Sequence, residues 1–234
     1  MIDRSLNYGR ENVVRFLADS RPYSVVLDIG AGGGSDLLLA RECSPGSRLL
    51  ALEGHPPNVA RLQALGIEVH PHDLEHDPFP FPDRRIDIVI ANQVLEHTKE
   101  IFWIMHEISR TLRDGGRVIV GIPNLAALHN RLLLLFGRQP SQIKTFSAHV
   151  RGFTHHDFLD FLERSFPGGY RVVDFRGANF YPFPPFMAKT LARAFPNSAW
   201  GIFFLLEKIR PYSGQFVDVL SKEQFETPFF AGAR

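Results

Sequence analysis

The chain has 234 residues, of which 44% are hydrophobic and 22% charged, and its formal net charge is +1. This composition provides enough apolar side chains for a hydrophobic core. It excludes an intrinsically disordered chain, which would be mostly polar and highly charged. The 26 basic and 25 acidic residues form no basic stripe, so we expect no nucleic-acid partner. The length predicts one domain, residues 1–234, and no internal repeats are present.

The expected location of the chain is the cytoplasm. One cysteine, Cys43, excludes an internal disulfide, and residues 1–4 lack the apolar stretch of a secretory signal. The longest apolar runs, at 132–136 and 199–206, are shorter than the roughly 20 residues that cross a bilayer. We therefore expect no transmembrane segment and leave open a contact with a membrane surface.

The first part of the chain alternates between strand and helix patterns. Residues 24–29 form a β-branched and leucine-rich run that predicts a strand, and residues 36–43 have the apolar spacing of a helix. The pattern repeats with a strand at 48–53, a helix at 57–65 and a strand at 67–70. Such βαβ units predict a parallel sheet with right-handed crossovers.

Two more strands follow a proline-rich stretch that is unsuited to a central strand. Residues 86–91 predict a fully buried strand, and residues 99–112 carry their apolar side chains on one stripe of a helix. The turn at residues 114–116, which contains two glycines, ends this helix before a strand at 117–122.

The remaining residues predict helices at 124–136 and 154–166 and strands at 170–175 and 199–209. We expect at least one of these two strands to be antiparallel. The complete pattern predicts an α/β fold, with a Rossmann-like, doubly wound sheet of seven strands, an antiparallel closing strand and a lid of helix and loop.

A glycine-rich loop follows the first predicted strand and runs from Asp28 through Gly30, Ala31, Gly32 and Gly34. Ligands of open α/β sheets bind beyond the carboxyl ends of the strands, and glycines let the backbone turn and approach a ligand closely. The spacing lacks the third glycine of a dinucleotide fingerprint, and the Lys-Ser/Thr pair of a phosphate loop is absent.

The pattern Asp28-x-Gly30-x-Gly32-x-Gly34 resembles the first motif of class I S-adenosylmethionine-dependent methyltransferases, and the resemblance extends over residues 24–124. It implies that the chain binds S-adenosyl-L-methionine. It also implies that Glu53 accepts the ribose hydroxyls, that an acidic residue after the third strand lies near the adenine, and that the loop after the fourth strand closes on the methionine end. The implied cofactor-binding residues are Asp28, Gly30, Ala31, Gly32, Gly34, Glu53, Gly54, Asp73, Leu74 and Asn92.

The resemblance divides the single domain into parts. Residues 1–123 form the expected cofactor-binding half, with an N-terminal helix over the cleft. Residues 124–209 form the lid and substrate half, and 210–234 form a tail. The lid itself is expected from residues 124–153 and 177–197.

Two histidines are candidate catalytic residues. His97 follows the fourth strand, in a loop that resembles that of ubiquinone-type O-methyltransferases, and His149 lies in a loop before the helix predicted at 154–166. Either imidazole could act as a base near neutral pH, although His97 could instead brace the following helix. We prefer His149, because a lid loop could bring it to the acceptor.

We expect no metal ion. Some quinone-forming relatives bind a divalent metal with two glutamates and a histidine in the loop after the fourth strand, and Gln93 replaces the first glutamate here. His155 and His156 open a helix for which Thr154 is the predicted N-cap, and we expect this pair at the surface.

Residues 180–187 concentrate aromatic side chains between prolines, which preset an extended chain. This segment could cap core residues or form the wall of an apolar substrate pocket, and the sequence leaves both open.

Residues 122–125, 130–132 and 136–140 resemble the methionine-biosynthesis protein W family, whose members share the methyltransferase fold and are linked to activation of a homoserine acyltransferase. The expected function is methyl transfer from S-adenosylmethionine to a hydroxyl or amine of a small molecule, such as a sugar, a lipid or a secondary metabolite. The alternative is a non-catalytic protein that activates a partner acyltransferase in methionine biosynthesis. The expected partner is the small-molecule acceptor, and a homodimer is left open.

Overall fold

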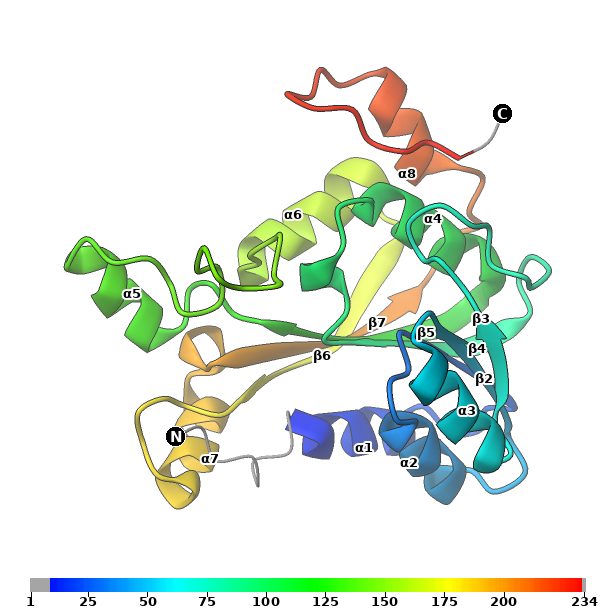
Figure 1. Ribbon diagram of the computed structural model, residues 1–234, viewed down its shortest axis with the longest axis horizontal. Coiled ribbons are helices and arrows are strands. Elements are labelled where there is room, and N and C mark those ends of the chain that lie inside the picture. Colours follow the sequence, from blue (N-terminus) through cyan, green and yellow to red (C-terminus); the bar gives the residue numbers. More distant parts are fainter. Residues whose placement is uncertain (1–8, 233–234) are drawn as a thin grey trace.

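The computed structural model describes residues 9–232 and contains one seven-stranded sheet in the order β3-β2-β1-β4-β5-β7-β6 (Figure 1). Strands β1 to β5 pair in parallel, whereas β7 is antiparallel to both β5 and β6. The strand order reverses between β1 and β4, and α/β sheets bind ligands at such a switch point. The strands are β1 (Val25–Ile29), β2 (Arg48–Glu53), β3 (Glu68–Pro71), β4 (Ile86–Asn92), β5 (Leu112–Pro123), β6 (Tyr170–Ala178) and β7 (Gly201–Lys208).

Helices cover both faces of this sheet (Figure 1). One core contains Phe16 and Leu37 from the first two helices, and the other contains Ile104 and Phe158 from helices on the opposite face. The α-helices are α1 (Arg10–Asp19), α2 (Ser35–Cys43), α3 (Pro56–Ala64), α4 (Ile101–Thr111), α5 (Leu128–Leu135), α6 (His155–Ser165), α7 (Pro185–Ala194) and α8 (Gln215–Asp218), and the 3-10 turns are η2 (Leu95–His97), η3 (Pro196–Ser198) and η4 (Val219–Ser221). Within residues 9–232, no helix combines the length and the apolar composition needed to cross a membrane.

Strand β1 explains why its sequence is almost wholly apolar. Val26 packs in the core beneath α1 to α3, and Leu27 packs in the core on the other face. Because successive side chains point to opposite faces, a strand covered on both faces needs apolar residues at consecutive positions. Asp28 is the one charged residue of the strand, and it lies at the end that faces the switch point.

Most of the predicted strands and helices are confirmed with small shifts at their ends, and the closing strand β7 is antiparallel as expected. The separating turn predicted at 114–116 is wrong, because β5 already begins at Leu112 and these residues form an irregular part of its pairing with β4. The clearest correction concerns the helix predicted at 124–136, which begins only at Leu128. The amide of Asn124 donates to the carbonyls of Asn197 and Ala199, both at 2.9 Å, and its Oδ1 accepts from the backbone of Ala126. These bonds hold the chain in a turn before the helix can start.

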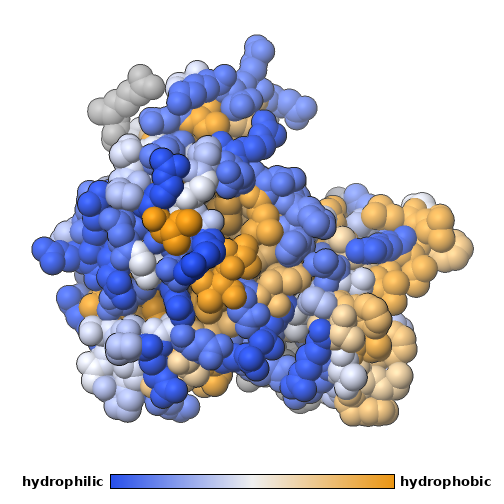
Figure 2. Space-filling model, turned by 180° about the vertical axis from the view of Figure 1, so that it is seen from behind, coloured by the Kyte–Doolittle hydropathy of each residue, from blue (hydrophilic) through white to orange (hydrophobic). Residues whose placement is uncertain are grey.

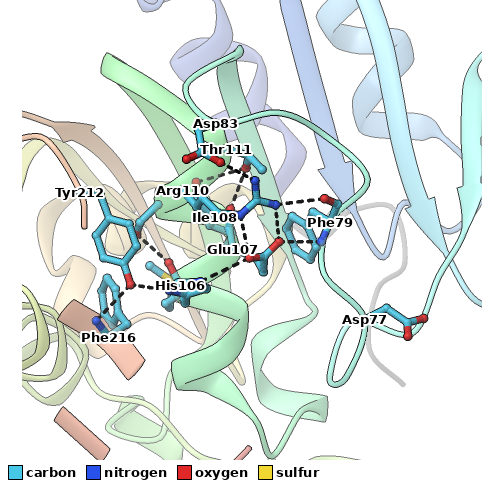
Figure 3. A network of polar contacts seen from close by, with 12 residues as sticks. Asp77, Phe79, Asp83, His106, Glu107, Ile108, Arg110, Thr111, Tyr212 and Phe216 are labelled. Carbon is cyan, nitrogen blue, oxygen red and sulfur yellow. Dashed lines mark hydrogen bonds and ion pairs between the residues drawn. The ribbon is translucent and has the colours of Figure 1, made fainter. Parts of the chain in front are cut away.

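The proline-rich segment between β3 and β4 is attached to α4 by a buried ion pair (Figure 3). The Glu107 carboxylate accepts the backbone N–H of Phe79 at 2.6 Å and pairs with Arg110 at 2.6 Å. Arg110 also donates to the Phe79 carbonyl and pairs with Asp83 at 2.7 Å. A segment without regular secondary structure thereby satisfies its backbone groups through side chains of a helix.

Candidate functional site

The glycine loop after β1 adopts a backbone that only glycine enters readily. Gly30, Gly32 and Gly34 have φ angles of 63°, 53° and 80°. A Cβ at Gly30 would meet Val94 at 2.8 Å, and one at Gly34 would meet Leu62 at 2.8 Å. A Cβ at Gly32 would meet no atom within 4 Å, so this glycine borders open space.

That open space is a cavity of about 360 Å³ at the carboxyl ends of β1 and β4. Seven of the residues expected in the site line it, namely Asp28, Gly30, Ala31, Gly32, Asn92, His97 and His149. The other five expected residues, Gly34, Glu53, Gly54, Asp73 and Leu74, are not among those that line it. Residues from before and from after residue 123, the boundary expected between the two halves, therefore meet at this cavity.

Glu53 lies at the end of β2 and orders the loop from beside the cavity. Its Oε2 accepts the N–H of Gly32 at 2.7 Å, and its Oε1 accepts the N–H of His55 at 2.8 Å. A carboxylate has about four lone-pair positions, so two remain for a ligand.

Asp73 is exposed and stabilises a turn after β3. It accepts the backbone N–H of Glu75 at 2.9 Å and pairs with His76 at 3.1 Å. The hydrogen bond from the Glu75 backbone, followed by that from His76, holds the pKa of the Asp73 carboxyl below its usual value. Leu74 packs against the core beneath α4, so its side chain is directed away from solvent.

Sequence reasoning missed Asp36, which lies beside the expected Asp28 at the base of the cavity. Asp36, in the first turn of α2, accepts from Arg10 at 2.8 Å and from the amide of Asn92 at 2.8 Å. Burial, with Asp36 nearby, raises the pKa of the Asp28 carboxyl well above its usual value. The expected N-terminal helix over the cleft was the available signal, because Arg10 begins that helix and lines the cavity.

The loop between α5 and α6, which the sequence predicted as part of a lid, brings His149 against His97, with ring centroids 4.6 Å apart. Nδ1 of His97 is 3.2 Å from the carbonyl of Ala148, and Nδ1 of His149 is 2.7 Å from the carbonyl of Gln142. The backbone of the same loop is joined to η2, since the N–H of Val150 donates to the Glu96 carbonyl at 2.9 Å. Burial, followed by the neighbouring His97, lowers the pKa of His149.

Glu96 is the residue of this group that sequence reasoning did not single out. Its side chain lines the cavity and is 1% exposed. Within residues 9–232, neither carboxylate oxygen has a hydrogen-bond partner. Burial raises the pKa of this carboxyl to about 7. A buried carboxyl without a partner is uncommon in folded proteins and marks a functional candidate.

Other expected features lie outside the cavity. Thr154 caps α6 as predicted, by accepting the N–H of Asp157 at 3.1 Å. His156 is exposed as expected, whereas His155 turns inward, with its ring 4.3 Å from that of Phe175. The surface position predicted for His155 is therefore wrong.

The aromatic segment at 180–187 covers core residues as predicted and also lines an apolar groove, and its predicted role as the wall of a substrate pocket stays a prediction. Phe180 is buried in a small cluster with α7, whereas Tyr181 is exposed. Tyr181 and Pro182 line an apolar groove together with Leu132 and Phe136. Trp200 lines both this groove and the main cavity, so the two adjoin each other.

The strand order, the glycine loop and the cavity at the switch point define a class I S-adenosylmethionine-dependent methyltransferase fold. Among solved structures, an S-adenosylmethionine-dependent methyltransferase of Archaeoglobus fulgidus has a TM-score of 0.61 at 15% identity, covering 88% of this chain and 95% of that one. The N-methyltransferase NodS of Bradyrhizobium japonicum, in complex with S-adenosyl-L-homocysteine, has a TM-score of 0.61 at 13% identity, covering 89% and 90%. These similarities establish the fold.

The chain belongs to the methionine biosynthesis protein MetW family, whose model matches residues 10–163. It is 30% identical over 131 residues to the bifunctional methionine biosynthesis protein MetXA/MetW of Rhodopirellula baltica, which covers 53% of this chain and 20% of that protein. It is 31% identical over 123 residues to an arsenite methyltransferase of Halobacterium salinarum, covering 49% of this chain and 31% of that protein. The chain thus spans a third or less of the length of these curated relatives.

Proposed function

We propose that the chain transfers a methyl group from S-adenosylmethionine to a hydroxyl or amine of a small molecule. The observation that carries this proposal is the open backbone at Gly32, beside a cavity of about 360 Å³ at the switch point of the sheet. A ligand can approach the main chain there without meeting a side chain. The names of one relative, an arsenite methyltransferase, and of one structural neighbour, an N-methyltransferase, agree with methyl transfer.

The proposed cofactor lies along the glycine loop. Glu53, ordered by two backbone N–H groups, keeps lone pairs for the ribose hydroxyls. Oδ1 of Asn92 is buried and has no partner within the described residues, so the ammonium group of the methionine portion would satisfy it. Asp73 would reach the adenine only from outside the cavity, which makes it the weakest of the proposed cofactor contacts.

The proposed acceptor enters on the side of η2 and the lid. Methyl transfer requires an in-line approach to the sulfonium, so most of the catalysis comes from positioning and from exclusion of water. His97 and His149 face this side, and either could accept a proton from the acceptor. The free thiol of Cys43 agrees with a reducing compartment, for which we propose the cytoplasm.

A second candidate function is activation of a partner acyltransferase in methionine biosynthesis. Membership of the MetW family and the similarity to a bifunctional MetXA/MetW protein favour it. In that case the cavity would bind a regulatory ligand or none, and no methyl group would be transferred.

Calorimetry with S-adenosylmethionine and S-adenosylhomocysteine, with NAD as the control ligand, tests the first proposal. We expect micromolar dissociation constants for S-adenosylmethionine and S-adenosylhomocysteine and no detectable binding of NAD. Formation of S-adenosylhomocysteine with a panel of sugars, lipids and phenols then tests transfer. If the chain binds neither S-adenosylmethionine nor S-adenosylhomocysteine, the first proposal is contradicted. If it increases the activity of a homoserine acyltransferase without consuming S-adenosylmethionine, the second function is supported.

A further inference from the structure

We propose that Glu96, His97 and His149 form a binding site for a divalent transition-metal ion at the acceptor end of the cavity. One ligand atom of each residue lies within 4.8 Å of the other two. The three residues come from η2 and from the lid loop, so the site exists only when the lid is docked. Binding of an ion requires neither cofactor nor acceptor, so this proposal is tested separately from the proposed methyl transfer. An imidazole that binds the ion through Nε2 cannot also accept a proton, so an occupied site would replace the role of base proposed for His97 or His149.

The two imidazoles are oriented as they are in protein metal sites. Nδ1 of each ring lies beside a backbone carbonyl, that of Ala148 for His97 and that of Gln142 for His149. An N–H at Nδ1 fixes the ring and leaves Nε2 unprotonated, as a metal ligand requires. Nε2 of His97 is 4.0 Å from Oε1 of Glu96.

The Glu96 carboxylate favours binding of a cation at this site. It is almost completely buried, and within residues 9–232 no hydrogen-bond donor reaches either oxygen. An ionised carboxylate in such surroundings is costly unless a cation or a donor satisfies it. An ion between this carboxylate and the two Nε2 atoms would supply that charge.

The ligand types select the class of ion. Two imidazole nitrogens and one carboxylate oxygen suit zinc, manganese, iron or cobalt, whereas magnesium and calcium prefer oxygen ligands alone. Metal–ligand bonds of about 2.1 Å place neighbouring ligand atoms roughly 3 to 3.5 Å apart, so the side chains must close by about 1 Å. Three protein ligands also leave coordination positions open toward the cavity, where an oxygen of an acceptor could bind.

This inference replaces the expectation that no metal binds. That expectation considered the loop after β4, in which Gln93 breaks the glutamate pattern. The lid supplies a third ligand from a distant part of the chain, and Gln93 is not needed.

The test is a titration of metal-stripped protein in the absence of cofactor, with cobalt(II) followed by visible absorption and with zinc, which has a filled d shell, followed by calorimetry. We expect one equivalent to bind with a micromolar or lower dissociation constant, and His149→Ala or Glu96→Gln to weaken binding at least 30-fold. The matched control, His156→Ala, removes an exposed histidine of α6 and keeps full affinity.

Thermal melts of each variant without metal show whether it is folded. If metal-stripped wild-type protein binds less than about 0.1 equivalent of metal ion per chain, the proposal is overturned. A folded His149→Ala chain that binds as tightly as wild type overturns it as well. Cofactor calorimetry on the same stripped protein reports the proposed methyl transfer separately.

A second observation independently points to a membrane contact. Apolar side chains are exposed at the C-terminal end of α5 and in the first turn of α7, with Leu135 and Phe136 each 76% exposed and Phe186 75% exposed. Figure 2 shows orange side chains gathered at the end of the molecule that carries these helices. We call α5, the loop to residue 150 and residues 181–187 the apolar surface. Exposed patches of this kind mark binding to a partner or a membrane.

The charges around the apolar surface favour an anionic bilayer. Residues 115–156 and 175–206 contain no aspartate or glutamate, although the whole chain is almost neutral. Arg131, Arg138 and Lys144 are exposed on or after α5. Apolar side chains with a purely basic rim fit the headgroup region of acidic lipids. We infer that the apolar surface docks on an anionic membrane.

Co-sedimentation with vesicles tests this inference. We expect the chain to bind vesicles that contain about 30% phosphatidylglycerol, an anionic lipid, and not to bind vesicles of pure phosphatidylcholine. Phe136→Ser and Arg138→Glu should each weaken binding at least 10-fold, whereas the control Ile209→Ser, at an exposed apolar residue after β7, should not. If the wild-type chain does not bind anionic vesicles, the membrane assignment is overturned. The same holds if the chain instead self-associates and Phe136→Ser abolishes this association.

Discussion

Substituting alanine at Gly32 separates the role of this residue in folding from its role in binding. Gly32 has a φ of 53°. An alanine there costs about 1 to 2 kcal/mol in the left-handed region. The new methyl would meet no atom within 4 Å, so no clash adds to this cost. For a chain of this length, each kcal/mol lowers the melting temperature by about 2 to 4 °C. We therefore expect a folded variant that melts about 2 to 8 °C lower.

The same methyl would project toward the cavity, where the cofactor is proposed to approach the backbone. We expect it to weaken binding of S-adenosylhomocysteine more than 10-fold, which corresponds to about 1.4 kcal/mol. Gly66→Ala is the matched control, because Gly66 has a φ of 68°, has no atom within 4 Å of a built Cβ and lies outside the cavity. The control should lose similar stability and keep its affinity. Gly34→Ala should be less stable than both, since its methyl would meet Leu62 at 2.8 Å.

Differential scanning calorimetry and isothermal titration on these chains decide the matter. If Gly32→Ala binds the ligand as tightly as Gly66→Ala, the cofactor does not approach the main chain at this loop. The assignment of the cavity as the cofactor site would then fail, even if the fold is unchanged.

Four further predictions follow from other contacts. Glu53→Gln should weaken binding of S-adenosylmethionine by about 1.5 to 3 kcal/mol in calorimetry, because charge-assisted hydrogen bonds are lost; unchanged affinity would remove Glu53 from the site. Arg110→Ala should destabilise the chain by about 3 to 5 kcal/mol in urea, since it leaves Glu107 buried without its partner. Arg171→Ala, at an exposed ion pair, should cost less than about 1 kcal/mol, and equal losses would refute this contrast. His149→Ala should lower turnover about 100-fold in an acceptor assay with cofactor affinity unchanged, and full turnover would exclude a role in catalysis. Although burial opposes it, the backbone N–H groups of Ser24 and Val25 and the side chain of Arg113 hold the pKa of Asp87 below its usual value. This stability is present above the unfolded pKa and is lost as pH falls through the folded one, so Asp87→Asn should flatten the acid limb of a pH–stability curve.

The sequence predicted the strands and the glycine loop of residues 25–123 well because their signals are local. The glycines of the loop after β1 are needed for backbone angles within a few residues, and the spacing records this directly. Strands β1, β2 and β4 are buried on both faces, so their apolar runs could be recognised without knowing their neighbours. Capping by Thr154 is local in the same sense.

The acceptor half was predicted less well because its contacts join distant segments. The amide of Asn130 donates to the Asn124 carbonyl at 3.2 Å and to the Gln142 side chain, which holds the lid loop against α5. Nothing in the spacing of these residues indicates their pairing. His149 reaches His97 only through this arrangement, so its neighbours could not be predicted from the sequence. The same limit hid Lys208, a buried lysine whose ammonium donates to the carbonyl of Ser109 at the end of α4.

The two halves of the cavity therefore depend on different physical constraints. The side proposed for the cofactor is formed by backbone angles that allow few substitutions other than glycine, so it can change little without losing its shape. The side proposed for the acceptor is formed by side chains on η2 and on a loop held by amide hydrogen bonds, and neither of these segments is part of the sheet. Glu96 belongs to the second group, and its unsatisfied carboxylate lowers the stability of the empty chain. Because stability alone would favour a neutral residue at this position, a requirement at the site explains the glutamate better than a requirement of the fold.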